Sequence, residues 1–445
     1  MGDAVERRDA ANGAAPLPYA RTIELRGHII DSHVLSQVMD LVMDHSAEFY
    51  IEQFDVGRHK YDPSYARIAL HAATPAALDT LVEAVGRLGA QLLAADERDA
   101  RTAPAPADGV LPAGFHATTN MPTEVRVGGR WLPVEAIEMD LAIALRPGAD
   151  GAPAGAYAVP MADVRAGTPV VVGHEGVRVL PVERPRNPAL LGSPSRGAQG
   201  AHFSFMSSAV SSERPKAAAI AELAAQLRQV RAAGGRTLLV GGPAIVHTGA
   251  GPELASLIRR GYVNVLFAGN ALAAHDIESA LYGTSLGVSL DAGSEGAAIE
   301  HGHEHHLRAI NAIRACGSIR AAVERGLLTR GIMYECVRND VPYVLAGSIR
   351  DDGPLPDVLT DVMDAQRAMR RLIQADGGVA LAMLVGTTLH AIAVGNLLPA
   401  STLTVCVDIN PAVVTKLLDR GSLQTAGLVI DAGGFLRELT RQLPE

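Results

Sequence analysis

Four histidines lie within six residues, in the segment HGHEHH at 301–306. Imidazoles at alternating positions can bind a metal ion, but no cysteine or carboxylate cluster with ligand spacing accompanies them. A polar loop that leads into the following helix is the preferred interpretation, and we predict no metal site. Imidazole also titrates near neutral pH, so one of these side chains can instead act as a general acid or base.

A second polar run, GSIRDDGPLPD at 347–357, can recognise an amino acid. The guanidinium of Arg350 can bind a carboxylate, and Asp351 and Asp352 can bind an ammonium group. The alternative is a solvated loop held by turns that aspartate side chains stabilise. Asp357 is expected at the start of a helix, where the helix dipole favours a carboxylate.

Small and polar residues also follow the expected strands of the C-terminal half. In an open parallel sheet, ligands bind beyond the carboxyl ends of the strands, small residues let a ligand approach the backbone, and helix N-termini favour phosphate. Each such residue alone is as well explained as a turn former or helix cap, but together they indicate a nucleotide site, although no GxGxxG motif is present. The segments are Gly241 to Pro243, Gly269 to Ala271, Ser348 to Asp352, Gly386 to His390, Asp408 to Asn410 and Asp431 to Gly433. Asp408 has the position of a carboxylate that accepts hydrogen bonds from a ribose.

The elements that must position these residues form an α/β protein with several parts. Residues 1–20 are expected to be a disordered tail, and 21–98 a small α+β sandwich in which Thr74 and Pro75 start the last helix. Short strands separated by Gly and Pro indicate a β-rich module over 110–186. Over 201–445, buried apolar strands alternate with helices, which predicts a Rossmann-like parallel sheet covered on both faces.

Composition excludes several classes of function. The 445 residues carry a net charge of −9, which argues against a nucleic-acid binder. We expect no membrane span, because the most apolar stretch, residues 379–407, is interrupted by His390, Asn396 and Pro399. Three cysteines without a CxxC pair, and an N-terminus without a secretory pattern, predict a cytoplasmic protein. Packing between parallel-sheet domains favours a homo-oligomer.

Several long segments resemble a known family. AGNALAAHDIE, GHEHHLRAIN, AGSIRDDGPLPDV, HAIAVGNLLP and VDINPAVVTKLLDRG are similar to the archaeal-type ornithine cyclodeaminases. GHIIDSHVL, FDVGRHKYDPSYARI and GVLPAGFHATTN resemble the conserved region shared with plant bifunctional lysine-oxoglutarate reductase/saccharopine dehydrogenase. The same module resembles the C-terminal half of cyanobacterial arginine dihydrolases, so arginine hydrolysis is not carried over. The resemblance covers about residues 21–440.

The resemblance implies a tightly held NAD in a deoxyhypusine-synthase-like nucleotide domain. The segment DAGSEGAAIE, before the histidine cluster, looks longer than is usual in the family. The implied NAD contacts are Asn270, Ala271, Asp352, Thr387, Thr388, Leu389, His390, Asp408, Asp431 and Ala432.

The resemblance further implies that an amino-acid substrate, L-ornithine, is converted to L-proline and ammonia while a hydride is recycled internally. The base is expected among His275, Asp276 and His303, which we do not rank, and Arg350 with Asp351 is expected to bind the substrate. Two alternatives stay open. One is a related NAD-dependent amino-acid oxidoreductase with another substrate, and the other is a non-catalytic amino-acid sensor that holds NAD.

Overall fold

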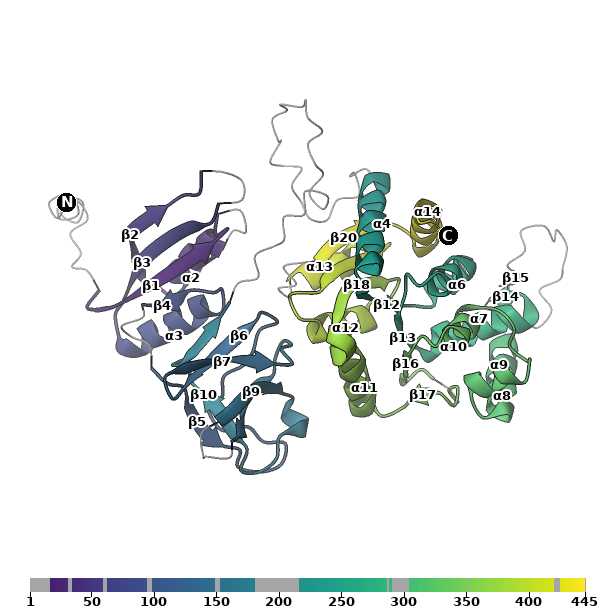
Figure 1. Ribbon diagram of the computed structural model, residues 1–445, viewed down its shortest axis with the longest axis horizontal. Helices are drawn as coiled ribbons and strands as arrows, with labels where there is room; N and C mark the ends of the chain where they lie inside the picture. The colour runs from purple at the N-terminus through teal and green to yellow at the C-terminus, as the bar shows by residue number, and fades with distance from the viewer. Residues whose placement is uncertain are drawn as a thin grey trace. The chain divides into compact units, whose positions relative to one another are not determined.

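The computed structural model describes residues 17–30, 34–58, 62–93, 98–148, 153–180, 216–285, 288–289, 304–351, 353–419 and 425–444. They belong to two compact units, Met1–Pro185 and Arg186–Glu445, which we describe one at a time (Figure 1). Residues 1–16 of the expected tail lie outside the described residues, and the first strand already begins at Tyr19.

The first unit opens with a four-stranded antiparallel sheet in the order β2-β3-β1-β4. The large apolar side chains of its strands, such as Ile23 and Leu70, pack against Val38 and Leu81 of the two helices. The last helix begins as its sequence predicts, because the Thr74 hydroxyl accepts a hydrogen bond from the Ala77 amide at 3.1 Å. The elements are β1 (Tyr19–Gly27), α2 (Val34–Asp44), β2 (Glu48–Asp55), β3 (Ser64–Ala72), α3 (Pro75–Gly86) and β4 (Gln91–Leu92).

The same unit continues into a seven-stranded sheet in the order β11-β6-β7-β9-β8-β10-β5. All its pairs are antiparallel except β7 with β9, and Val125, Ile143 and Val171 are buried in its core. The short strands follow from frequent turns, as the Gly and Pro spacing predicted. They are β5 (Arg101–Pro104), β6 (Thr123–Val127), β7 (Arg130–Glu135), β8 (Ala142–Pro147), β9 (Pro153–Val159), β10 (Pro169–Val172) and β11 (Val177–Val179).

The second unit is built on a seven-stranded sheet in the order β17-β16-β13-β12-β18-β19-β20. Every neighbouring pair is parallel, which confirms the predicted parallel sheet. The strands are β12 (Arg236–Gly241), β13 (Val265–Gly269), β16 (Tyr343–Ala346), β17 (Val358–Leu359), β18 (Val379–Val385), β19 (Leu403–Asp408) and β20 (Thr425–Val429). A two-stranded ribbon, β14 (Thr284–Ser285) with β15 (Val288–Ser289), stands apart from this sheet.

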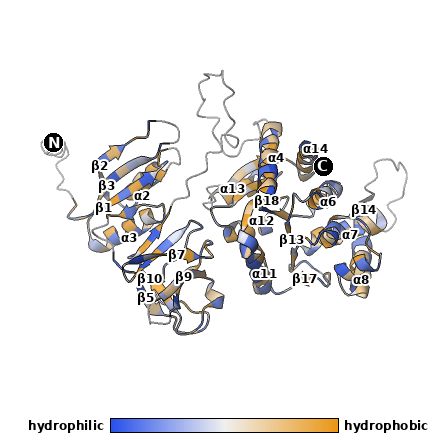
Figure 2. Cartoon of the chain, in the orientation of Figure 1, coloured by the Kyte–Doolittle hydropathy of each residue, from blue (hydrophilic) through white to orange (hydrophobic). Residues whose placement is uncertain are grey.

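Helices cover both faces of the parallel sheet, because successive strand residues point to opposite sides. Leu239 and Leu266 belong to one core, with α4 (Lys216–Ala232), α5 (Ala244–His247), α6 (Gly251–Arg259), α7 (Asn270–Tyr282), α8 (His305–Cys316), α9 (Ile319–Glu324), α10 (Ile332–Arg338) and α14 (Ala432–Gln442). Leu238 and Phe267 belong to the other, with α11 (Val362–Gln374), α12 (Leu389–Leu397) and α13 (Pro411–Asp419). Figure 2 shows hydrophobic and hydrophilic residues sharing these helices, as in α4 and α11.

The expectation that Asp357 starts a helix is wrong. Val358 pairs in register with Leu345 of β16, so the chain is still extended there and α11 begins only at Val362. Its cap is Asp361, whose Oδ1 accepts from two amides at 2.8 and 3.0 Å. The Asp357 carboxylate instead accepts hydrogen bonds from the Tyr343 hydroxyl at 3.0 Å and the Ile319 amide at 2.8 Å, and thereby joins β16 to α9.

Among the described helices, none is both long and apolar enough to cross a membrane.

Candidate functional site

The order of the parallel sheet reverses between β12 and β18, and the loops after these two strands meet there. The amide of Gly242 donates to the carbonyl of Val385 at 3.0 Å. A Cβ atom on Gly242 would lie only 1.9 Å from the carbonyl oxygen of Gly386, and Gly386 has a φ of +61°. Such a reversal opens the crevice in which doubly wound proteins bind nucleotides. Glycine is required here because the two backbones are in contact.

A helix N-terminus opens at the same place. Helix α12 (Leu389–Leu397) begins three residues after Gly386, and its N-cap residue, Thr388, makes no side-chain hydrogen bond to the first turn. Thr387 is half-buried, whereas Thr388 and Leu389 are exposed. The amides of a first helical turn need acceptors, and the positive end of the helix dipole favours an anion. The residues at the start of α12 can therefore hold a phosphate group.

Three other predicted residues come together on this edge of the sheet. A Cβ atom on Gly269, at the end of β13, would lie 3.0 Å from Cε1 of His390. Burial lowers the pKa of the His390 imidazole, and the nearby Asp351 carboxylate acts in the opposite direction. Residues from the ends of β13, β16 and β18 thus surround one imidazole, as expected when the carboxyl ends of parallel strands share an edge.

The remaining predicted contacts hold the loops of this edge in place. The buried Asn270 side chain accepts a hydrogen bond from the Leu355 amide at 3.0 Å, and Ala271 is half-buried beside it. Asp408 accepts from the Asn410 amide at 2.8 Å. Asp431 caps α14 by accepting from the Gly434 amide at 2.7 Å, and the next residue, Ala432, is buried.

A cluster of imidazoles lies on the helices that follow β12 and β13. The ring of His275 in α7 lies 4.7 Å from the ring of His247 and 5.8 Å from the ring of His306, measured between centroids. His305 stacks on Tyr282 at 5.1 Å. Burial lowers the pKa of His247, and the neighbouring His275 lowers it further. No group of three or more His, Cys, Asp or Glu side chains in the described part of the chain could hold a metal ion.

Glu278 orients the central imidazole of this cluster. Its side chain is completely buried, and a buried carboxylate needs polar partners. One oxygen accepts from Nδ1 of His275 at 2.8 Å, and the other accepts from the Thr284 hydroxyl at 2.9 Å. When Nδ1 of His275 carries the proton, Nε2 is left with a lone pair. The contact with Glu278 therefore fixes the orientation of the His275 ring.

Asp276, the neighbouring candidate, serves the fold. Its two oxygens accept hydrogen bonds from the amides of Ile332 and Met333, both at 2.8 Å, at the start of α10. Burial raises the pKa of this carboxyl group to about 6, although the two amides act against the shift. Each oxygen of this buried carboxylate already accepts a backbone amide, so the geometry favours His275 over Asp276 as the candidate base.

The candidates for binding the substrate, Arg350 and Asp351, lie in the loop after β16. Arg350 is exposed, and its backbone amide donates to the Ser348 hydroxyl at 3.1 Å. The Asp351 carboxylate accepts from the Ser348 amide at 2.8 Å, so part of the polar run is a turn, as the alternative interpretation held. Asp352 and His303 lie outside the described residues.

Sequence reasoning missed Glu278, Thr284 and His247. The spacing of His275 and Glu278, three residues apart on an expected helix, was a usable signal, because such residues lie on one face. Thr284 and His247 carried no such signal, since they meet the pair only through the fold.

Three family profiles match the chain in succession. They are the LOR/SDH bifunctional enzyme conserved region over residues 20–121, the first region of the arginine dihydrolase ArgZ-like C-terminal part over 122–220, and its Rossmann fold over 221–439.

Relatives match along nearly the whole chain. The ornithine cyclodeaminase of Methanothermobacter thermautotrophicus is 50% identical over 423 residues, which are 95% of this chain and 97% of that protein. The apo crystal structure of ArgZ, an arginine dihydrolase of the cyanobacterial ornithine-ammonia cycle, has a TM-score of 0.78 at 37% identity and covers 97% of this chain and 59% of that one.

AgrE has been solved in a ternary complex with ornithine and NAD+. It is 40% identical to this chain and covers 97% of this chain and 58% of AgrE. The TM-score is 0.49, so the relation to AgrE rests on sequence identity. The near-complete match to the archaeal protein, together with the parallel sheet and the match to the Rossmann-fold profile, shows that this chain is an enzyme of the ornithine cyclodeaminase family.

Proposed function

We propose that this protein converts L-ornithine to L-proline and ammonia with a bound NAD. The observation that carries the proposal is the reversal of strand order between β12 and β18, where Gly242 contacts Gly386 close to the start of α12, in a chain of this family. The reaction is balanced without an external oxidant or reductant, because ornithine and proline plus ammonia contain the same atoms.

The residues of the sheet edge fit the cofactor. The contact of Gly242 with Gly386 fixes the loop that leads to α12, and the amides at Thr388 and Leu389 suit the phosphates of the cofactor. Asp408, which follows β19, is the carboxylate for a ribose hydroxyl, and Asn270, Ala271, Thr387, His390, Asp431 and Ala432 complete the proposed set. NAD, when bound, takes up a hydride from Cα of the substrate and returns it, so the reaction has no net redox change.

His275 is the proposed base for the substrate's α-ammonium group. Its Nδ1 is held by Glu278, so Nε2 can accept the proton, and the adjacent rings of His247 and His306 offer sites that can pass it on. Arg350 is proposed for the substrate carboxylate and Asp351 for an ammonium group, because both follow β16 on the same edge of the sheet.

The test uses purified protein without added nucleotide. Incubation with L-ornithine is expected to yield equal amounts of proline and ammonia with no net NADH, and denatured protein should release NAD. Net NADH formation with another amino acid would favour the related oxidoreductase. Retained NAD, with ornithine raising the melting temperature but no product formed, would favour the sensor.

We also infer that the enzyme is a cytoplasmic homo-oligomer. Ile349, Leu389 and Ile409 follow β16, β18 and β19, and they are 107%, 75% and 73% exposed. Three large apolar side chains on one edge indicate a surface that a further molecule covers. The free thiols of Cys316, Cys336 and Cys406 fit a reducing compartment. Sedimentation of the wild type and of Ile349→Ser tests the assembly, and a monomeric wild type would contradict it.

A further inference from the structure

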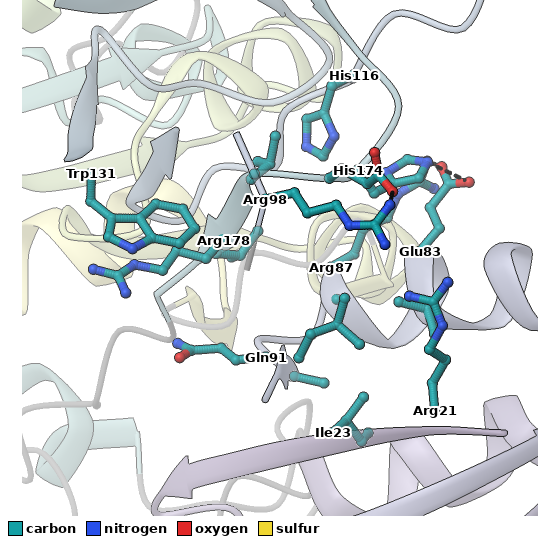
Figure 3. A pocket seen from close by; sticks show the side chains of 18 residues that line it. Arg21, Ile23, Glu83, Arg87, Gln91, Arg98, His116, Trp131, His174 and Arg178 are labelled. Carbon is teal, nitrogen blue, oxygen red and sulfur yellow. Dashed lines mark hydrogen bonds and ion pairs between the residues drawn. The ribbon is translucent and has the colours of Figure 1, made fainter. Parts of the chain in front are cut away.

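The first unit contains a pocket of about 330 Å³, which none of the site residues above lines. It lies between β1, α3 and β4 of the first sheet and β7 and β11 of the second, and Figure 3 shows its side chains. A volume of this size is at the lower end of the range for small-molecule sites. The pocket can therefore take a compact metabolite.

The charged side chains that line the pocket are mostly cationic. Four arginines line it, against two glutamates. Glu83 is already shared, since Arg87 lies at 2.6 Å and His174 at 2.8 Å from its two oxygens. Glu175 is likewise shared between Arg98 at 3.4 Å and Arg101 at 3.6 Å. Both carboxylates of the lining are therefore already paired and cannot neutralise Arg21 or Arg178. The lining therefore favours anions.

The two other arginines are held by acids behind the lining. Arg178 lies 2.6 Å from Glu124, and Arg21 lies 3.8 Å from Asp79. A carboxylate occupies at most two of the five N–H donors of a guanidinium, so both arginines keep donors for a ligand. Figure 3 shows Arg178 with Trp131 on one side of the pocket and Arg21 on the other. The guanidiniums of Arg178 and Arg21 are thus on different sides of the pocket.

Two imidazoles line the pocket without adding charge. Burial lowers the pKa of His116 to about 4, and burial also lowers the pKa of His174. Nδ1 of His116 is 3.1 Å from the Gly173 carbonyl and Nε2 of His174 is 2.8 Å from Glu83, so each ring has one nitrogen occupied as a donor. Neutral rings leave the recognition of charge to the arginines.

We propose that this pocket is a second ligand site, distinct from the proposed catalytic site, that binds a small dicarboxylate. Guanidiniums on opposite sides can each bind one carboxylate, and planar guanidiniums match planar carboxylates well. The apolar wall, which includes Ile23, Val82 and Leu92, suits a short hydrocarbon body between the two acids.

The protein carries its own reporter for this site. Trp131 is the only tryptophan in the sequence, and the guanidinium of Arg178 lies 4.1 Å from the centre of its ring. A ligand that binds the guanidinium of Arg178 changes the environment of the Trp131 indole. Trp fluorescence of the full-length protein can therefore be titrated with succinate and glutarate, with butyrate as the monocarboxylate of similar length and inorganic phosphate as a further anion, all at constant ionic strength.

We expect a saturable fluorescence change with succinate or glutarate, and at least tenfold weaker binding of butyrate and phosphate. Arg21→Gln and Arg178→Gln should each weaken dicarboxylate binding at least tenfold, and Arg178→Gln is measured by calorimetry because Arg178 lies against the Trp131 reporter. Arg146→Gln is the matched control, because Arg146 pairs with Glu135 on the same sheet but does not line the pocket, and it should bind as the wild type does.

Three results would overturn the proposal. They are the absence of saturable binding by both fluorescence and calorimetry, equal affinity for butyrate or phosphate, and unchanged affinity in both arginine variants. Because the assay measures binding and not turnover, its result is independent of whether the protein cyclises ornithine.

Discussion

The two candidate sites are built from different materials. The site at the carboxyl edge of the parallel sheet consists mainly of backbone groups. These are the contacting loops at Gly242 and Gly386 and the amides at the start of α12. In the pocket of the first unit, arginine, histidine and tryptophan side chains form the walls. A substitution that displaces backbone groups also lowers the free energy of unfolding. A substitution of a side chain that lines a pocket changes the free energy of unfolding little. Substitutions in the two sites should therefore differ in what they damage.

The largest effect is expected for Gly242→Ala. The added methyl group would lie 1.9 Å from the Gly386 carbonyl oxygen, and a backbone atom cannot rotate away from it. We expect a loss of about 3 kcal/mol in the free energy of unfolding, measured with urea, and a lower content of NAD. Gly251→Ala, where a Cβ atom meets nothing within 4 Å, is the control. A stable variant with full NAD content would show that the loops are not in contact.

Glu278→Gln tests the one side-chain pair on which the proposed chemistry depends. The amide can no longer accept a strong hydrogen bond from His275 as a carboxylate does, so the imidazole loses its fixed tautomer. We expect kcat for proline formation to fall about 100-fold, as is typical when the partner that orients a functional histidine is removed. Glu438→Gln, which affects contacts with Arg441 and Gln442 at the end of α14, should keep full activity. Unchanged kcat in Glu278→Gln would remove His275 from the mechanism.

Asp276→Asn separates a structural carboxylate from the neighbouring His275, which we propose as the base. An amide oxygen can accept from only one of the two α10 amides, so we expect a loss of about 1 to 3 kcal/mol at neutral pH. Activity per folded molecule should persist.

The same residue predicts a pH dependence of stability. Its pKa is raised from 3.8 to about 6 in the folded protein, so the folded state binds more protons than the unfolded state in that window. The contribution of Asp276 to the free energy of unfolding therefore falls as the pH rises from about 4 to about 6. The difference in stability between the wild type and Asp276→Asn, measured with urea across this range, should change in that direction. A constant difference would contradict the assigned burial effect.

The smallest effect is expected in the pocket of the first unit. Glu83 pairs with the half-exposed Arg87 and with His174, and exposed pairs of this kind contribute little. Glu83→Gln should lower the free energy of unfolding by less than about 1 kcal/mol and leave proline formation unchanged. A loss above about 2 kcal/mol would show that the pocket side chains hold the fold together.

The same contrast explains which features the sequence could predict. The residues after each strand are local, so Gly242, Gly269, His390 and Asp408 were found from the apolar runs before them. The pocket draws on side chains from Arg21 to Arg178, which no local pattern connects. Asp357 was misplaced for a related reason, because its neighbour Val358 pairs with β16 and that long-range pairing overrides the tendency to start a helix.

The short length of β17 affects the tendency of this protein to aggregate through its sheet edge. The strand occupies one edge of the parallel sheet and has only two residues, Val358 and Leu359. An edge of this length exposes few unpaired amide and carbonyl groups, so a strand from another molecule gains little by adding to it. This edge is therefore a poor template for fibril growth, even when the protein is concentrated.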